Sequence, residues 1–276
     1  MPSKQLDGQH VDIKVKTRYP EIHFDRLQMY FGDPYVIDLD NAVGSLTIYQ
    51  PTIGDVVRIG EDKFYSTLSI ITGNTTQFRY LLWQAGIDWN EFTDFQLFCS
   101  MYKQLDKDAL ALLFHDVDLL SFEQYDRHYA DGREELILMN EDQSIEINED
   151  VYQHFHQYYQ VMFNMKPEEE FTKDKFLKEW WIQKDERKAM RDAEKAKKGK
   201  DMSSSIQPLI SAYINHPGTK HNLQELRDVG VAEFFDSIQR LQIYESSIAC
   251  MSGLYSGFVD SKAIKPEDYN WLKEIS

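Results

Sequence analysis

The residues with the clearest chemical potential are the adjacent pair His115-Asp116, with Asp118 two positions later. Such a His-Asp pair is the core of the metal site in one family of phosphohydrolases. That site also needs an upstream histidine and a downstream aspartate on facing helices, and the earlier histidines, His10 and His23, lie in a stretch with little helical character. We therefore interpret residues 115–118 as the polar end of a helix. A metal-dependent phosphohydrolase-like enzyme is the weaker alternative.

Two further pairs of histidines have spacings that suit metal binding poorly. His154 and His156 lie on a predicted helix, where residues two apart point about 200° away from each other and cannot share one ion. His216 and His221 flank a Pro-Gly turn with no cysteine nearby. A zinc site there is possible in principle, but a polar loop explains these residues more simply.

Other sequence signals of catalysis or cofactor binding are weak. Asp38-Leu39-Asp40 fits the end of a strand better than a cation site, and neither Cys99 nor Cys250 has a histidine placed as an evident base. The chain has neither a Gly-x-Gly-x-x-Gly motif nor a Walker-type phosphate loop. We therefore expect no catalytic residue, no metal site and no cofactor, and we interpret the two cysteines as buried thiols.

Composition indicates a folded, acidic protein. The chain has 276 residues, 42% hydrophobic and 13% aromatic, and its formal net charge is −16. This charge disfavours nucleic acid as a partner, since phosphate binding needs clustered Lys and Arg. No run of 18 apolar residues is present, and residues 1–16 lack the apolar core of a signal peptide. We expect no membrane contact and a cytoplasmic location in the cell that makes the protein.

The first 50 residues are predicted to be extended. Arg26–Phe31 and Tyr35–Leu39 flank the turn Gly32-Asp33-Pro34, and a third short strand follows at Leu46–Tyr49. We expect a hairpin or a small three-stranded sheet at the edge of a helical body.

Helices are predicted from Pro51 onward. Thr52 with Asp55, and Thr93 with Gln96, have the spacing of capping boxes, in which each side chain satisfies a free backbone N–H of the first helical turn. Gly60 interrupts the first helical pattern. The second helical stretch covers residues 92–114, with a break at 105–106.

The period changes between residues 119 and 147, where short strands surround turn-rich segments. We expect a hairpin there, inserted between helices and able to project from the body. The next helix, residues 149–165, is rich in aromatic residues. These favour a core position, although an exposed partner-binding face is the alternative.

A long charged helix is predicted to start at Pro167, with three glutamates in its first turn and lysines at its end, as the helix dipole favours. Residues 173–200 contain eleven Lys and Arg against six Asp and Glu, a local balance of +5. A solvated face explains these charges best, and docking onto the acidic body of another copy is the functional alternative. Residues 199–205 are expected to form a linker, followed by a second helical unit.

The sequence therefore predicts a mainly α fold with small β elements and a multi-helix body. We expect three parts: residues 1–166 with the hairpins and the helical body, 167–204 with the long helix and linker, and 205–276 with the C-terminal helices. The aromatic residues of the long helix and of the aromatic helix are the candidate partner-binding residues: Phe176, Trp180, Trp181, Tyr152 and Tyr159.

The stretch from Tyr49 to Phe98 carries a family resemblance. It contains Tyr-Gln-Pro-Thr-Ile-Gly-Asp at 49–55, Ile-Gly-Glu at 59–61 and Leu-Trp-Gln-Ala-Gly-Ile-Asp-Trp at 82–89. A weaker similarity appears at residues 251–257 and 269–272. In these segments the chain resembles the tail assembly chaperones of long-tailed bacteriophages.

The resemblance implies a non-enzymatic scaffold made in the host cytoplasm. Such a chaperone would bind the long, helical tape measure protein, help recruit tail tube protein, and be absent from the finished virion. Self-association is a further expectation. The alternative within phage biology is a structural tail or baseplate component that is retained in the virion. The β insertion at 119–147 departs from what the resemblance implies.

Overall fold

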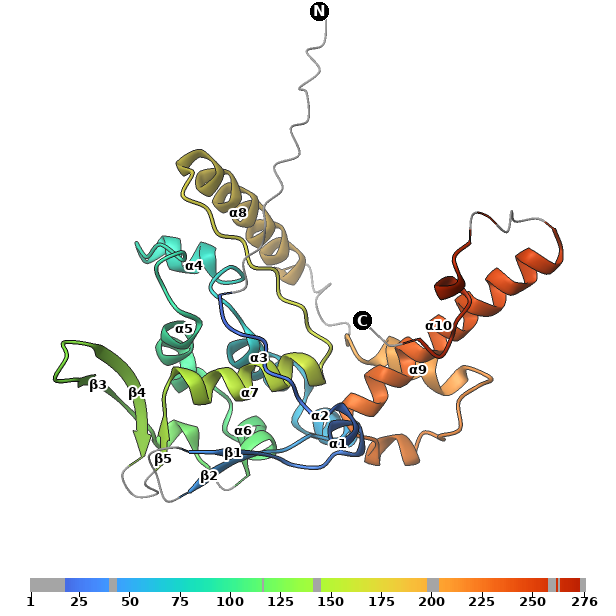
Figure 1. Ribbon diagram of the computed structural model, residues 1–276, viewed down its shortest axis with the longest axis horizontal. Coiled ribbons are helices and arrows are strands. Elements are labelled where there is room, and N and C mark those ends of the chain that lie inside the picture. Colours follow the sequence, from blue (N-terminus) through green and yellow to red (C-terminus); the bar gives the residue numbers. More distant parts are fainter. Residues whose placement is uncertain are drawn as a thin grey trace, which may run out of the picture.

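The computed structural model describes residues 18–39, 44–115, 117–140, 145–197, 204–257, 262 and 264–273. Within these ranges the protein is mainly α-helical and carries two small antiparallel sheets. A helical body forms the centre, and a β-hairpin and the helices α8 and α10 extend from it in different directions (Figure 1). The expected fold class is confirmed.

The described helices and strands follow one another along the chain as follows. The helices are α1 (Arg26–Phe31), α2 (Ile53–Ile59), α3 (Glu61–Thr72), α4 (Arg79–Gln84), α5 (Asp94–Met101), α6 (Lys107–Phe114), α7 (Glu149–Met162), α8 (Lys175–Lys197), α9 (Gln207–Asn215) and α10 (Val231–Tyr255). Short 3₁₀ helices are η1 (Tyr102–Gln104), η2 (Leu119–Ser121), η3 (Glu225–Asp228) and η4 (Pro266–Asp268). The strands are β1 (Tyr35–Asp38), β2 (Ser45–Ile48), β3 (Glu123–His128), β4 (Glu134–Asn140) and β5 (Ile145–Ile147).

The N-terminal hairpin pairs β1 with β2, with Tyr35 opposite Ile48. The strand predicted at Arg26–Phe31 is wrong, because this segment forms α1. The Asp25 side chain accepts hydrogen bonds from the first backbone N–H groups of α1, and Gly32 ends it with a left-handed φ of 79°. The N-cap, the C-cap and four good helix formers at 26–29 together favour a helix over the β propensity of Tyr30 and Phe31.

The capping boxes predicted at Thr52 and Thr93 are both confirmed, and they begin α2 and α5. Gly60 separates α2 from α3 with a φ of 98°, a backbone conformation that suits glycine. The predicted break near residue 105 is also confirmed, because η1 separates α5 from α6. These boundaries were predictable because local residues alone determine them.

The region 119–147 forms an antiparallel sheet in the order β3-β4-β5. The β3–β4 hairpin extends away from the helices (Figure 1), and almost all of β3 is exposed. Arg127 on β3 and Glu146 on β5 form a bidentate ion pair across β4, with Nη1 to Oε1 at 2.7 Å.

Helix α7 lies in the centre of the body (Figure 1), and its aromatic side chains are buried in the main core. Tyr152 and Phe155 pack edge to face, with ring centroids 5.2 Å apart. The core interpretation of this helix is therefore confirmed. Large apolar side chains on opposite sides of one helix require neighbours all round, which α3, α5 and β5 supply.

The long helix does not start at Pro167, as predicted, but at Lys175. The preceding residues 168–172 run as an extended strap over the loop before α4 and the loop after it, and the backbone groups of the strap bond to side chains of those loops. These tertiary hydrogen bonds replace the ones that a helix would make. Asp174 then caps α8 by accepting a hydrogen bond from the backbone N–H of Leu177.

The C-terminal helices share the core of the body. The backbone N–H of Ile53 donates to the carbonyl of Val229 at 2.9 Å, and that of Val231 donates to the carbonyl of Pro51 at 3.1 Å. Phe234, at the start of α10, is fully buried in the main core. The outer part of α10 extends beyond the body (Figure 1). Among the described residues, no helix combines the length and the apolar character needed to cross a bilayer.

Candidate protein-binding surface

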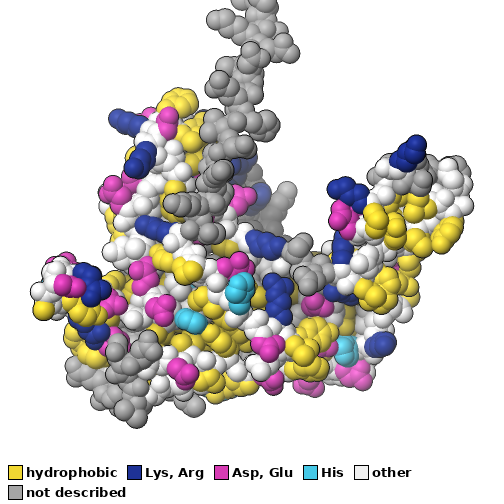
Figure 2. Space-filling view, in the orientation of Figure 1, with side chains coloured by type: hydrophobic (Ala, Val, Ile, Leu, Met, Phe, Trp, Pro, Cys, Tyr) yellow, Lys and Arg dark blue, Asp and Glu magenta, His cyan; other side chains and the backbone are white. Residues whose placement is uncertain are grey.

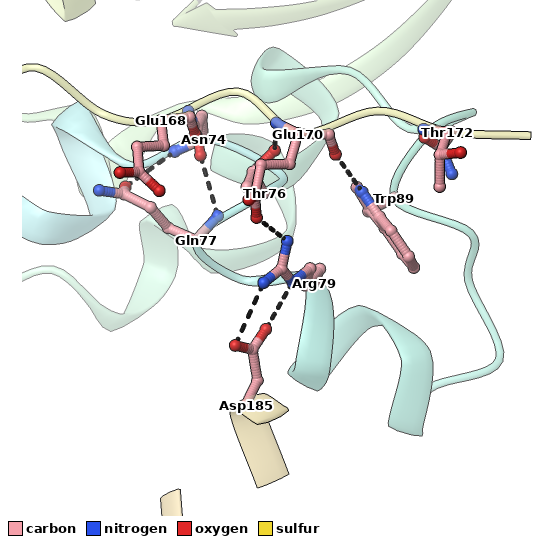
Figure 3. A network of polar contacts seen from close by, with 10 residues as sticks. Asn74, Thr76, Gln77, Arg79, Trp89, Glu168, Glu170, Thr172 and Asp185 are labelled. Carbon is pink, nitrogen blue, oxygen red and sulfur yellow. Dashed lines mark hydrogen bonds and ion pairs between the residues drawn. The ribbon is translucent and has the colours of Figure 1, made fainter. Parts of the chain in front are cut away.

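Helix α8 is held against the body by a buried arginine, Arg79, at the start of α4 (Figure 3). The Arg79 guanidinium binds both carboxylate oxygens of Asp185 on α8, with Nη2 to Oδ1 at 3.2 Å, and also binds Glu170 on the strap. It lies over the ring of Trp181, 5.1 Å from the ring centroid. Burial alone would lower the pKa of Arg79, but the hydrogen bonds to the two carboxylates outweigh it and raise the pKa. Arg79 therefore stays protonated, and it joins α4, α8 and the strap at 168–172.

The strap is fixed by side chains from the loops on either side of α4, each contributing one hydrogen bond (Figure 3). The partners lie 81 to 94 residues away in sequence, at distances of 3.0 to 3.1 Å. The four bonds run from Asn74 Nδ2 to the Glu168 carbonyl, from the Glu170 N–H to Thr76 Oγ1, from Trp89 Nε1 to the Glu170 carbonyl, and from the Thr172 N–H to Asn90 Oδ1. With its backbone bonded in this way, the strap determines where α8 begins.

One face of α8 packs on α4 and the loop after it. Trp181 and Ile182 form a second, smaller apolar cluster with Leu82, Trp89 and Leu97. The rings of Trp89 and Trp181 pack edge to face with centroids 6.3 Å apart. This cluster and the Arg79 ion pairs stabilise the same face of the helix.

The other face of α8 carries exposed apolar side chains that belong to neither apolar cluster of the described residues. Phe176 is 78% exposed, Trp180 51% and Met190 59%. At 100° per residue these three side chains lie on one side of the helix, opposite Trp181 and Ile182. Lys184 lies over the ring of Trp180, 5.7 Å from its centroid. Exposed large aromatic side chains on a helix that is rigidly attached to the body are characteristic of protein-binding surfaces.

The five candidate residues from the sequence divide into two groups. Phe176 and Trp180 lie on the surface of α8. Trp181, Tyr152 and Tyr159 are buried, and they do not reach the surface of this structure. The Tyr152 hydroxyl bonds to His156 Nδ1 at 2.9 Å, and the Tyr159 hydroxyl donates to the Leu113 carbonyl at 2.8 Å.

A second apolar surface, which the sequence reading did not single out, lies on the outer part of α10 and the segment after it. Apolar side chains gather over this projecting part of the molecule (Figure 2). The exposed large side chains there are Tyr244, Ile248, Tyr255, Tyr269, Trp271 and Leu272. Residues 241–257 contain one charged side chain, Glu245. The scarcity of charged residues in this stretch of an acidic chain is the sequence signal that could have identified the surface.

The last described residues of the segment after α10 are held against this helix. The Arg240 guanidinium donates to the carbonyls of Trp271, at 2.7 Å, and Lys273, at 2.8 Å. The rings of Tyr244 and Trp271 pack edge to face, with centroids 5.7 Å apart. The side chains of this surface are therefore positioned by contacts within the described chain.

The histidines of the α6 end and of α7 make structural contacts. The His115 ring stacks on Tyr49 with centroids 3.6 Å apart, and Asp116 lies outside the described residues. His154 Nδ1 bonds to the Tyr35 hydroxyl at 2.7 Å. His156 is buried, which lowers its pKa to about 4. Because the amide N–H of Gln160 donates to His156 Nε2, the ring proton lies on Nδ1 and is donated to the Ile71 carbonyl, at 2.8 Å.

The C-terminal histidines are also bound to neighbouring side chains. His216 Nε2 bonds to Glu245 at 3.0 Å, and His221 Nδ1 bonds to the Tyr213 hydroxyl at 2.9 Å. Asp40, the second aspartate of the 38–40 segment, lies outside the described residues. Over the described ranges, no three His, Cys, Asp or Glu side chains come together in a way that could hold a metal ion.

Comparison with known proteins gives no relative. No protein-family model, no curated protein and no solved structure matches this chain significantly.

Proposed function

We propose that this protein is a non-enzymatic tail assembly chaperone of a long-tailed bacteriophage, which binds the tape measure protein through the exposed face of α8. The proposal rests on one observation. Helix α8 exposes Phe176 and Trp180, while the buried contacts of Arg79 hold this helix against the body. A rigid apolar face binds another helix without the entropic cost of ordering a flexible segment.

The choice of partner rests on the family resemblance of residues 49–98. A tape measure protein is long and helical, and its apolar helix faces need cover before the tail tube is assembled around it. The acidic charge of the chain, −16, keeps such a complex soluble. A role in recruiting tail tube protein, and action in the host cytoplasm, belong to the same proposal.

Co-expression with the tape measure protein of the same genome tests this function. We expect the tape measure protein to become soluble and to co-purify with this chain. A tape measure protein that is equally insoluble with and without this chain, and that does not co-purify, would contradict the proposal. Detection of the chain in purified virions would instead support a structural tail component.

A further inference from the structure

The outer edge of β1 forms one wall of an acidic groove. The groove has a volume of about 330 Å³ and is lined by the five consecutive residues 35–39. Side chains alternate between the two faces of a strand, so a groove that touches five residues in a row follows the edge of the strand and not one face. Its opposite wall is formed by Glu146 of β5 and the first turns of α7, including Asp150 and His154.

This edge of β1 has no partner strand among the described residues. The sheet contains β1 and β2 alone, so β2 occupies the other edge. Apart from its ladder with β2, no backbone hydrogen bond of residues 35–38 is present within the described chain. Free N–H and C=O groups along a strand are a ready template for the addition of another strand. Neither Lys nor Pro, the residues that usually block such an edge, lies within β1.

The side chains around the edge indicate which segment would fit. Val36 is 51% exposed on the outer face of β1, and Asp38 is exposed beside it. Asp38 and Asp150 form no ion pair within the described chain, whereas Glu146 is paired with Arg127. No Lys or Arg lies among the residues that line the groove. An added strand therefore meets uncompensated negative charge on both walls.

We propose that this groove is a strand-docking site for an extended, basic segment of a partner protein. Backbone hydrogen bonds from the β1 edge hold the segment, and lysine or arginine side chains on its two faces lie near Asp38 and Asp150. The site is separate from the α8 surface, and it does not depend on the function proposed above.

A designed peptide tests the site on the full-length protein. The probe is acetyl-Lys-Lys-Val-Lys-Lys-Val-Lys-amide, which carries lysines on both faces of an extended strand, labelled with a fluorophore, and binding is followed by fluorescence anisotropy. Two peptides are methylated, one at the odd-numbered and one at the even-numbered backbone nitrogens, because only one of these sets donates N–H groups to β1. We expect saturable binding by the unmodified peptide and its loss in at least one methylated peptide, since methylation removes N–H donors and keeps the charge. Equal binding of both methylated peptides would show charge attraction alone and would overturn the proposal.

Charge reversal locates the site on the protein. Asp38→Lys and Asp150→Lys are each expected to weaken binding about fivefold, the equivalent of about 1 kcal/mol for one exposed charge pair. The matched control is Glu91→Lys, an exposed acidic residue outside the groove, which is expected to leave binding unchanged. Equal weakening by all three variants, or no binding by the unaltered protein, would overturn the proposal.

Discussion

Trp180 and Trp181 are neighbours in the sequence but face different surroundings on α8. Trp181 is 3% exposed and lies between Trp89 and the Arg79 guanidinium, whereas Trp180 is 51% exposed. The buried ring attaches the helix to the body, and the exposed ring is available to a partner. This division is the basis for separating stability from binding in the experiments below.

Replacing Arg79 by methionine should destabilise the protein strongly. Methionine keeps much of the volume but leaves the carboxylates of Glu170 and Asp185 without their cation. Loss of a buried pair costs about 3–5 kcal/mol, and because both carboxylates keep about a quarter of their exposure we expect about 2–3 kcal/mol. Urea unfolding followed by tryptophan fluorescence measures this. The control Arg58→Met removes an exposed ion pair and should cost less than about 1 kcal/mol; equal losses would contradict the role of Arg79.

Replacing Asp94 by asparagine should stabilise the protein at pH 7. Burial raises the pKa of Asp94 to about 6, with the nearby Glu169 and Glu149 adding to the shift. The ionised carboxylate is therefore costlier in the folded than in the unfolded state, and this cost is fully present above pH 6. Asparagine keeps an acceptor for the Thr75 N–H and removes the charge. We expect a gain of about 1–2 kcal/mol in the free energy of unfolding, after allowing for a lost helix-dipole contact. A loss of stability at pH 7 would contradict this account.

Asp94→Asn should also make the protein lose stability more steeply in acid, because the effect of protonating His156 is then no longer offset. Its pKa is lowered by burial from 6.5 to about 4, so the unfolded state binds the proton first as the pH falls. His156 therefore contributes stability that is complete above pH 6.5 and is lost between pH 6.5 and 4. Asp94 acts in the opposite direction, because its folded state takes up a proton near pH 6. We expect Asp94→Asn to lose stability more steeply than the unaltered protein from pH 6.5 to 4.5, as measured by urea midpoints. If the stability of the two proteins falls in parallel with pH, the conclusion that Asp94 and His156 act in opposite directions is contradicted.

Gly54 should matter for the attachment of the C-terminal unit. A Cβ at this position in α2 would lie 2.7 Å from the carbonyl oxygen of Arg227 in η3, a backbone atom that cannot move independently. Gly54→Ala should therefore cost about 1–3 kcal/mol in thermal or urea unfolding. Gly44→Ala is the control, because among the described residues no atom lies within 4 Å of the added Cβ, and the expected change is below about 0.5 kcal/mol. A neutral Gly54→Ala would show that η3 packs less closely than described.

Local signals in the sequence predicted much of the fold. Thr52 and Thr93 begin helices through capping boxes that involve residues three positions away. The strap at 168–172 was mispredicted as helix because its hydrogen-bond partners lie 81 to 94 residues away. Helix α1 was mispredicted as strand although Asp25 and Gly32 were visible as caps and Arg26, Leu27, Gln28 and Met29 are good helix formers, because the turn Gly32-Asp33-Pro34 was interpreted as the turn of a hairpin.

The candidate surface was predictable only in part. An aromatic group on the long helix is visible in the sequence, but which of Trp180 and Trp181 is exposed depends on the contact with Arg79, a residue about a hundred positions earlier. The β1 edge depends in the same way on which strands pair. Neither relationship is encoded in neighbouring residues.

The most direct test of the central claim combines Phe176→Ser and Trp180→Ser in the co-expression assay with the tape measure protein. Both side chains are exposed, so the free energy of unfolding should change by less than about 0.5 kcal/mol each. We predict that the double variant folds but no longer co-purifies with the tape measure protein or keeps it soluble. The double control Trp271→Ser and Leu272→Ser, on the α10 surface, should retain binding. A Phe176→Ser, Trp180→Ser variant that solubilises and binds the tape measure protein as well as the unaltered chain would contradict the claim.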